Sequence, residues 1–403
     1  MIKDLRNIKG FHFNGFSAGL RENGEPDLAI IHADEPADAA AAFTQNLVVA
    51  APVKISKKQL ENHKIQTVVI NAVNANACTG ALGEQAVYEE IKRAAITFQV
   101  EENDVFIAST GVIGRPFPIN QVLNGISFAM GQLTNTAQGS DALARAIMTT
   151  DTRPKGASIS FNLNGKTIHF GGVAKGSGMI HPNMGTMLSF VLTDLNIEGS
   201  VLKSALKIVV DRSFNMISVD GDTSTNDTVL VLASGEAGNE RIDSEQHKDY
   251  AEIVTQLTSL CIKLAQEIIN DAEGITKMIT FEVKGLPTEA DCVKIIRTVS
   301  TSLLVKTALF GKDPNWGRLF AAAGRSGVDF DPDRVDLSMG EQHELKLLSA
   351  GQPVALDENI AEKVLAERDV KISFDFNQGE AHATGWGSDL SYDYVKINAE
   401  YTT

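Results

Sequence analysis

A threonine at the start of an apolar run is the side chain of this sequence best placed for nucleophilic chemistry. Thr186 lies between a glycine-rich stretch, residues 171–178, and the apolar residues 187–192, which are typical of a buried strand. Glycines allow a ligand to approach the backbone closely, and a buried strand holds a hydroxyl group at its start rigidly. Without further information these features are also typical of a loop that leads into a core strand, so a structural role is the default for Thr186.

The segments around Thr186 resemble those of a known enzyme family. Lys175-Gly-Ser-Gly-Met179, followed by Pro182-Asn-Met-Gly-Thr-Met-Leu188, is similar to the self-cleavage segment of the ornithine acetyltransferase family, also called glutamate N-acetyltransferase. Further motifs match in the family's order: Asn74-Ala-Asn-Ala-Cys-Thr-Gly80, Ser109-Thr-Gly-Val-Ile-Gly114, Thr149-Thr-Asp-Thr152, Asp220-Gly-Asp-Thr-Ser-Thr-Asn-Asp227, Phe310-Gly-Lys-Asp-Pro-Asn-Trp-Gly-Arg318 and Ile397-Asn-Ala-Glu-Tyr-Thr-Thr403. Each motif alone is weak, but the set spans nearly the full chain and is specific.

The resemblance implies a self-processing acetyltransferase. The chain would be cut between Gly185 and Thr186, which leaves Thr186 with a free α-amino group. Such an amine, with an ordinary pKa of roughly 7.7 to 8.0, can take the proton of the neighbouring hydroxyl group. In the implied ping-pong reaction, Thr186 accepts the acetyl group of N2-acetylornithine and passes it to glutamate. The family usually has alanine where this chain has Gly185, and this departure bears on the rate of processing.

The resemblance also assigns the oxyanion hole to Thr110 and Gly111. Hydrogen-bond donors aimed at the developing oxyanion are often the largest single term in acyl transfer. A glycine after a strand allows a backbone N–H to point into a cavity, which agrees with this assignment. From the residues alone, Ser109-Thr-Gly111 is more typical of a turn that ends a strand.

Several residues match family positions that contact the substrate. They are Thr152, Lys175, Thr186, Glu273, Asn398 and Thr403. A lysine ammonium suits an α-carboxylate, and the family's carboxylate at position 273 would pair with an amine of ornithine. Without the resemblance, Lys175 would be expected in a solvated loop and Glu273 on the surface at a helix end. The carboxyl-terminal residues would close over the pocket, although a chain terminus is disordered unless other residues hold it.

The elements that must position these residues follow a mixed α/β pattern. Short β-rich runs at residues 67–70 and 105–108 are each followed by a polar corner, and the alanine-rich residues 85–97 favour a helix. Asn164-Gly165, between alternating apolar residues, predicts a hairpin over residues 159–169. Functional sites are often built on loops at strand ends, so we expect the site at these corners.

Helices dominate the next part of the chain. Apolar residues recur at helical spacing in two stretches: Val201, Ala205 and Val209, and then Ile253, Leu257, Cys261, Leu264 and Ile268. Thr288 is a predicted helix cap, because Pro287-Thr-Glu289 has the composition of a helix start. A soft boundary near Ile275 precedes a further α/β unit.

The expected fold class is therefore α/β. By resemblance it is the layered arrangement of sheets and helices of the ornithine acetyltransferase or DmpA-like fold. The expected divisions are residues 1–185 as an α chain that carries the oxyanion hole, 186–274 as the start of a β chain with the nucleophile strand and core helices, and 275–403 as a smaller C-terminal α/β domain. The resemblance further implies that two such heterodimers pair into a heterotetramer.

Composition excludes several classes of partner. Asp and Glu outnumber Lys and Arg by 51 to 36, giving a formal charge of −15, whereas nucleic-acid binding needs a basic surface. No run approaches the roughly 20 apolar residues that span a bilayer, so no membrane contact is expected. The first ten residues lack the apolar core of a secretory signal, and we therefore expect a cytoplasmic protein.

No metal or organic cofactor is expected. Cys78, Cys261 and Cys292 are widely spaced and indicate three buried thiols rather than a metal site. Gly176-Ser-Gly178 lacks the third glycine of a dinucleotide loop. Asp220-Gly-Asp-Thr-Ser224 begins like a calcium loop but has Thr225 at the glycine position, so a hydrogen-bonded turn beside the active site is favoured.

Two other functions remain open from the sequence. The first is a related amino-terminal-nucleophile aminopeptidase or amidase, in which water replaces glutamate as the acceptor. The second is an uncleaved, non-enzymatic homologue in which Gly185 has impaired processing. The sequence also leaves open whether acetyl-CoA serves as a second acetyl donor and whether the pathway is arginine biosynthesis or a specialised one.

Overall fold

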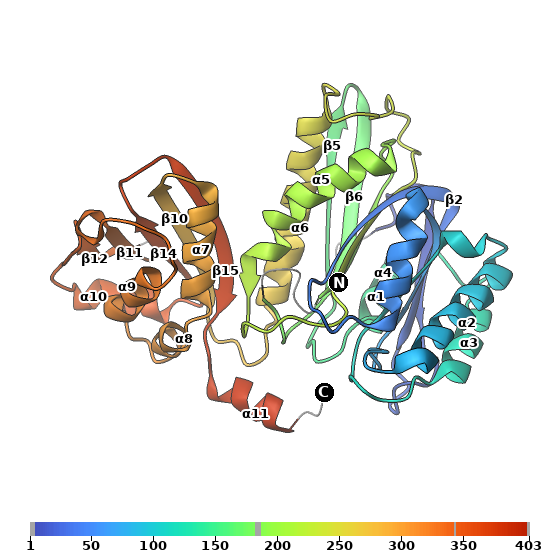
Figure 1. Cartoon of the computed structure of the whole chain (residues 1–403), viewed down its shortest axis with the longest axis horizontal. Coiled ribbons are helices and arrows are strands. Elements are labelled where there is room, and N and C mark those ends of the chain that lie inside the picture. The colour runs from blue at the N-terminus through green and yellow to red at the C-terminus, as the bar shows by residue number, and fades with distance from the viewer. Residues whose placement is uncertain (1–4, 182–186, 342–343, 401–403) are drawn as a thin grey trace.

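The computed structural model describes residues 5–181, 187–341 and 344–400, and it shows two mixed sheets with helices packed on them (Figure 1). Gly185, Thr186 and Thr403 therefore lie outside the described residues. The α/β class expected from the sequence is confirmed, including a smaller unit near the carboxyl terminus.

The larger sheet has the strand order β4-β3-β2-β9-β7-β6-β5, and β1 pairs with β2 outside this path. Its strands are β1 (Phe11–Phe16), β2 (Leu28–Phe43), β3 (Lys64–Asn71), β4 (Val105–Ser109), β5 (Lys155–Leu163), β6 (Lys166–Lys175), β7 (Leu188–Thr193) and β9 (Thr228–Ala233). The apolar run expected at residues 187–192 forms β7, which is buried at every position. Strands that are buried on both faces carry continuous apolar runs, as β7 and β9 do.

Helices cover both sides of this sheet. They are α1 (Ala51–Gln59), α2 (Gly80–Phe98), α3 (Ile119–Phe128), α4 (Ala137–Ala146), α5 (Gly199–Asp211) and α6 (Tyr250–Ile269), with short 3-10 turns at η1 (Leu60–Asn62), η2 (Glu102–Asp104) and η3 (Phe214–Met216). Helix α6 packs against β5 and β6, whereas α4 packs against β1 (Figure 1). The apolar stripes predicted from residues 201–209 and 253–268 are the buried faces of α5 and α6, as expected.

The predicted hairpin is also confirmed. Strands β5 and β6 pair antiparallel and meet at Asn164-Gly165, where both residues have positive φ, 51° and 82°. Asn162 Oδ1 accepts the N–H of Gly165 at 2.9 Å. Asparagine and glycine tolerate this left-handed backbone, which explains why this pair sets the turn.

The second sheet has the order β13-β12-β11-β14-β10-β15-β8. Its strands are β8 (Ile217–Ser218), β10 (Met278–Leu286), β11 (Asp336–Met339), β12 (Leu345–Ser349), β13 (Gln352–Pro353), β14 (Asp369–Asp375) and β15 (Ala381–Ser388). The helices of this part are α7 (Glu289–Ser300), α8 (Leu303–Phe310), α9 (Trp316–Gly324), α10 (Glu358–Ala366) and α11 (Tyr392–Glu400), with a 3-10 turn at η4 (Pro332–Arg334). Thr288 caps α7 as predicted, because its side chain accepts the N–H of Asp291 at 3.2 Å.

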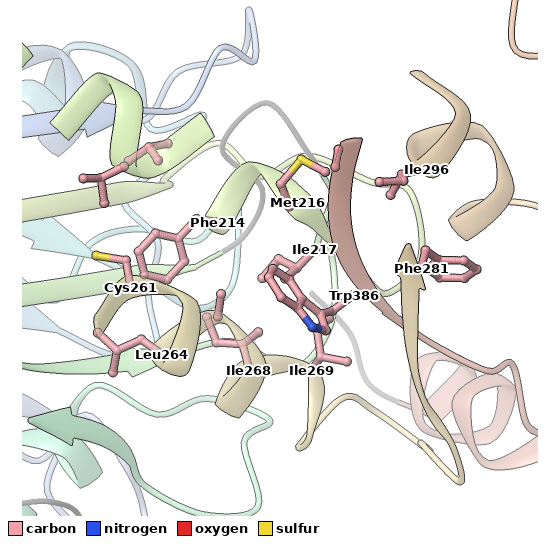
Figure 2. Packing of buried hydrophobic residues seen from close by; sticks show 14 of the residues in the cluster. Phe214, Met216, Ile217, Cys261, Leu264, Ile268, Ile269, Phe281, Ile296 and Trp386 are labelled. Carbon is pink, nitrogen blue, oxygen red and sulfur yellow. The ribbon is translucent and has the colours of Figure 1, made fainter. Parts of the chain in front are cut away.

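One continuous apolar core joins the two sheets. Figure 2 shows Phe214 and Ile217, from η3 and β8, beside the face of α6 that carries Leu264 and Ile268, with Trp386 of β15 next to them. All these side chains are buried. The strand β8 pairs with β15 although it precedes residue 275, so the second sheet takes a strand from the middle of the chain. The domain divisions at 185/186 and 274/275 stay predictions.

The expectation of three buried thiols is wrong at one position. Cys261 and Cys292 are buried in α6 and α7, but Cys78 is exposed. Cys78 has φ 58° in the polar turn before α2, and its side chain faces solvent there, outside the buried face of any helix or strand. Among the residues that the structure describes, none of the helices combines the length and apolar character that a bilayer crossing requires.

Candidate active site

A pocket of about 140 Å³ lies where several strands of the larger sheet end. Its wall is formed by the corner after β4, the residues that follow β6, the turn before β9 and helix α11. The sequence predicted the corners after β3 and β4 as a place for a site, and residues of both line this pocket. It also contains five of the residues assigned by resemblance: Thr110, Gly111, Lys175, Glu273 and Asn398.

Thr110 and Gly111 occupy the corner after β4. Thr110 is 4% exposed, and its backbone N–H already donates to Asn71 O at 2.9 Å. An oxyanion would therefore have to use the Thr110 side chain rather than its backbone. Gly111 has φ 132°, and a Cβ at this position would lie 2.1 Å from the carbonyl carbon of Val73. Only glycine fits this corner, because any larger residue would collide with backbone.

Lys175 ends β6 with its ammonium group inside the pocket wall. The side chain is buried, and its Nζ donates to Thr110 Oγ1 at 3.2 Å. Burial lowers the pKa of Lys175, while the nearby carboxylate of Asp151 acts in the opposite direction. A desolvated ammonium gains from an anionic ligand, so this position suits a carboxylate group of a substrate.

A buried ionic cluster supports the Lys175 side of the pocket. The ammonium of Lys155 contacts Asp151 and lies 2.6 Å from Asp271 Oδ2. Asp151 also accepts the N–H of Gly176, the residue after Lys175, at 2.7 Å. Burial acts to raise the pKa of Asp151, but the ammonium groups of Lys155 and Lys175 outweigh it and bring the value to about 2. Asp151 is therefore a charged carboxylate that holds the backbone next to Lys175.

Thr152 lies on this cluster and not among the residues that line the pocket. Its hydroxyl group donates to Asp271 Oδ1, and its backbone N–H donates to Asp271 Oδ2 at 3.0 Å. The neighbouring Thr149 and Thr150 line the pocket instead. Thr152 is thus linked through Asp271 to Lys155 in this structure, and its direct contact with substrate stays a prediction.

The opposite side of the pocket is acidic. Glu273 follows α6, and its carboxylate accepts the side-chain amide of Asn398 at 2.7 Å. Asp220 accepts the backbone N–H groups of Met179 and Ile180 at 2.6 and 2.9 Å and the hydroxyl of Tyr394 at 3.2 Å. Burial raises the pKa of Asp220. A cation on one wall and carboxylates on the other match an amino acid that carries a second amine.

The turn predicted at residues 220–226 is confirmed as a hydrogen-bonded structure. Asp220 Oδ1 accepts the N–H of Asp222 at 3.2 Å, and Ser224 Oγ accepts the N–H of Asn226 at 3.1 Å. The side chain of Asn226 then donates to the backbone carbonyls of Ser109 and Ala75 at 2.9 and 2.7 Å. This turn therefore fixes the loop that carries Thr110.

The nucleophile assigned by resemblance lies between two described parts of the chain. Lys175, the last residue of β6, pairs with Leu188, the first residue of β7, and Lys175 lines the pocket. The N–H of Met187, the residue after Thr186, donates to Asp227 Oδ1 at 2.9 Å. Burial raises the pKa of Asp227 well above its ordinary value, and its Oδ2 has no hydrogen-bond partner among the described residues.

Some residues of the site were not predicted. Asp151 lies inside a matching motif, which was the signal that could have identified it, and Asp220 was predicted only as part of a turn beside the site. Lys155 and Tyr394 had no such signal, because they reach the site through partners far away in sequence. Within the described ranges, no group of three or more His, Cys, Asp or Glu side chains is arranged to hold a metal ion.

Comparison with known proteins identifies the family. The model of the ArgJ family matches residues 12–403. The chain belongs to the ArgJ family. This membership confirms the expected resemblance, and the chain is accordingly an enzyme of the acyltransferase type. Thr110, Lys175 and Glu273, which the resemblance assigns to the site, line one pocket of this ArgJ-family protein.

Named relatives cover almost the whole chain. The arginine biosynthesis bifunctional protein ArgJ of Symbiobacterium thermophilum is 48% identical over 98% of this chain and 97% of its own length. The protein of the same name from Caldanaerobacter subterraneus subsp. tengcongensis is 46% identical over 98% of this chain and 97% of its own. A crystal structure of the arginine biosynthesis bifunctional protein ArgJ from Bacillus halodurans is 40% identical, with a TM-score of 0.51, and covers 54% of this chain and 100% of the solved chain.

Proposed function

We propose that this enzyme transfers the acetyl group of N2-acetylornithine to glutamate through an acetyl-Thr186 intermediate, after cutting itself between Gly185 and Thr186. The observation that carries the proposal is the pairing of a buried ammonium with acidic side chains across one small pocket. Lys175 contacts Thr110, and Glu273 lines the same cavity. The names of the relatives, which refer to arginine biosynthesis, support a diamino acid as the ligand.

Self-cleavage precedes transfer in this proposal. The Thr186 hydroxyl attacks the carbonyl carbon of Gly185, and the peptide C–N bond breaks to give an ester. Water then hydrolyses the ester, which restores the hydroxyl and leaves a free amine on Thr186. Before the cut this nitrogen is an amide and cannot accept a proton; afterwards it can act as the local base.

Acetyl transfer proceeds in two balanced halves. The Thr186 hydroxyl attacks the acetyl carbonyl while its proton passes to the α-amino group, and a tetrahedral oxyanion forms. The C–N bond then breaks, and the departing α-amine of ornithine takes up the proton. In the second half, the amine of glutamate attacks the acetyl-Thr186 ester, and the α-amino group of Thr186 takes up the proton of the attacking amine. The C–O bond then breaks, and the oxygen of Thr186 takes this proton back as it leaves as a hydroxyl group. The Thr110 side chain and the Gly111 backbone are the proposed donors to both oxyanions.

Substrate binding uses the two walls of the pocket. The Lys175 ammonium would receive the substrate α-carboxylate, and the Glu273 carboxylate would receive the side-chain ammonium of ornithine. Asn398 and Thr403 belong to the carboxyl-terminal part that would cover the ligand, and Thr152 would act beside them. The hydrogen bond from Asn398 to Glu273 supports this arrangement.

The proposal also covers the assembly of the enzyme, its location and a second acetyl donor, as the family resemblance implies. The two products would stay associated as α and β chains and pair into a heterotetramer in the cytoplasm. Acetyl-CoA would serve as a second donor, which the word bifunctional in the names of the relatives supports. No cofactor is required for the steps described above.

A donor and acceptor panel on purified protein tests the proposal. We expect acetyl transfer from N2-acetylornithine to glutamate, and two bands on a denaturing gel that correspond to residues 1–185 and 186–403. Release of acetate to water at the same rate with or without glutamate would instead identify an amidase. A single full-length band without transfer would identify a non-enzymatic homologue.

A further inference from the structure

Helix α11 is attached to the protein mainly by polar contacts at the pocket. None of its nine residues, all of them described, is buried, and Tyr392 is 82% exposed. Figure 1 shows α11 lying below the two sheets. Tyr394 is the residue of this helix that packs against the large apolar core, where it is partly buried. The hydrophobic effect can therefore hold this helix only weakly.

The base of α11 is fitted closely to the residue after Glu273. Ser391 Oγ donates to Gly274 O at 2.6 Å. Gly274 has φ 66°, and a Cβ there would lie 2.4 Å from the backbone nitrogen of Tyr394. Glycine is required at this position, and the close approach places the start of α11 directly beside the acidic wall of the pocket.

Tyr394 and Asn398 lie on the same face of α11, one turn apart. The Tyr394 hydroxyl donates to Asp220 Oδ2 at 3.2 Å, and the Asn398 amide donates to Glu273 Oε2 at 2.7 Å. The same amide also contacts the backbone carbonyl of Tyr394 at 3.1 Å. The position of Asn398 over Glu273 is therefore set by where Tyr394 attaches.

Asp220 is a rigid attachment point. Its two oxygens accept the backbone N–H groups of Met179, Ile180 and Asp222 in addition to the Tyr394 hydroxyl. Met179 has φ 57°, an uncommon conformation for a residue with a side chain, and Asp220 holds it in place. A helix bonded to this carboxylate is thereby fixed to the loop that follows Lys175.

We propose that Tyr394 is a positioning residue for the substrate amine: it anchors α11 on Asp220 so that Asn398 orients the Glu273 carboxylate toward an incoming ammonium group. This inference rests on the proposed function, which supplies the amine-bearing substrate. Tyr394 itself contacts the carboxylate of Asp220 and not the reacting atoms. Its contribution is to affinity for diamino ligands such as ornithine, and not to the acetyl-transfer step.

The test compares Tyr394→Phe with Tyr392→Phe. Phenylalanine at position 394 keeps the partly buried ring packed against the core and removes only the hydroxyl. Tyr392 has an exposed ring that stacks edge-on with Phe310 and serves as the matched control. We expect Tyr394→Phe to raise the Kd of ornithine, measured by calorimetry, and the KM of N2-acetylornithine by about 5- to 20-fold. The kcat and the extent of self-cleavage should remain within about two-fold of wild type. Tyr392→Phe should leave all four quantities unchanged.

Two further measurements separate this role from a merely structural one. Backbone amides of residues 392–400 should exchange with deuterium about ten-fold faster in Tyr394→Phe without ligand, because the helix loses its anchor. The affinity losses of Tyr394→Phe and Asn398→Ala should not add in the double variant, because both act on Glu273. Additive losses, an unchanged ornithine Kd, or a loss of self-cleavage would overturn the proposal. If the wild type bound ornithine but transferred no acetyl group, the proposed function would be wrong. The calorimetric Kd and the deuterium exchange would still test the role of Tyr394.

Discussion

The ammonium group of Lys175 lies 3.2 Å from the hydroxyl oxygen of Thr110, and both side chains are buried. Because the lysine donates to this oxygen, the proton of the threonine hydroxyl is free to point elsewhere, and the cation makes that hydroxyl a better donor. The backbone N–H of Thr110 is already used by Asn71 O. The side chain of Thr110 is thus the part of this residue that can stabilise an oxyanion.

Thr110→Ala should lower kcat by about 10² to 10³ and raise KM much less, because the lost donor acts chiefly on charge that develops in the transition state. Steady-state kinetics with N2-acetylornithine and glutamate measure both constants. Thr110→Ser keeps the hydroxyl and is the matched control, with most of kcat retained. A normal kcat in a folded Thr110→Ala protein would show that the oxyanion hole does not use this side chain.

Thr186→Ala should abolish both self-cleavage and acetyl transfer, since one hydroxyl group serves both reactions. A denaturing gel reports cleavage, and a coupled assay reports transfer. Thr186→Ser retains the hydroxyl and loses only a methyl group, so it should keep part of both activities. Acetyl transfer by uncut Thr186→Ala protein would rule out this residue as the nucleophile.

Lys175→Met should shift the acidic limb of the kcat/KM profile to higher pH. In the wild type the limb should rise with pH as the free amine of Thr186 loses its proton. A nearby ammonium disfavours a second positive charge and lowers the pKa of that amine, so removing the cation raises it. The profile is measured with N2-acetylornithine well below saturation on fully cleaved protein. A shift to lower pH would exclude this electrostatic role, and a flat wild-type profile would exclude the amine as the base.

Lys155→Met should lower the free energy of unfolding by about 3 to 5 kcal/mol, because two buried carboxylates lose their shared cation. Urea denaturation near pH 7 measures the loss. Arg153→Met is the matched control: Arg153 forms a partly exposed ion pair with Glu267, and its removal should cost less than about 1 kcal/mol.

The stability difference between the wild type and Lys155→Met should also depend on pH. The folded-state pKa of Asp151 is about 2, below the ordinary 3.8 of an aspartate, so its charged form stabilises the protein above pH 4. That contribution is lost as the pH falls through about 2. The stability gap between wild type and Lys155→Met should therefore narrow between pH 4 and pH 2, and a gap that widens in acid would contradict a charged Asp151.

Local patterns predicted much of the fold. The Asn164-Gly165 turn, the Thr288 cap and the buried faces of α5 and α6 each depend on residues within a few positions of one another, so a single sequence contains the necessary information. The predicted burial of Cys78 was wrong, because the residue type alone does not show whether a side chain in a tight turn is buried.

The site was only partly predictable, because many of its contacts join residues that are far apart in the sequence. The family resemblance assigned Thr110, Lys175 and Glu273 to the site, but the buried environment of Lys175 depends on partners far away in sequence, such as Thr110. Lys155 meets Asp271 across 116 positions, and Tyr394 meets Asp220 across 174. No periodicity or spacing rule relates residues so far apart, and only the folded chain brings them together.

The strand order of the larger sheet limits when the chain can be cut. Strands β7 and β9 follow the proposed cut but lie in the interior of the sheet, between β2 and β6, which precede it. Strand β6, before the cut, pairs with β7, after it, and β7 also pairs with β9, so the cut would separate the chain without releasing either piece. Assembly must then come before scission. A separately synthesised piece 1–185 would lack β7 and β9, the two strands that connect β2 to β6, so its larger sheet could not form until the second piece supplied them.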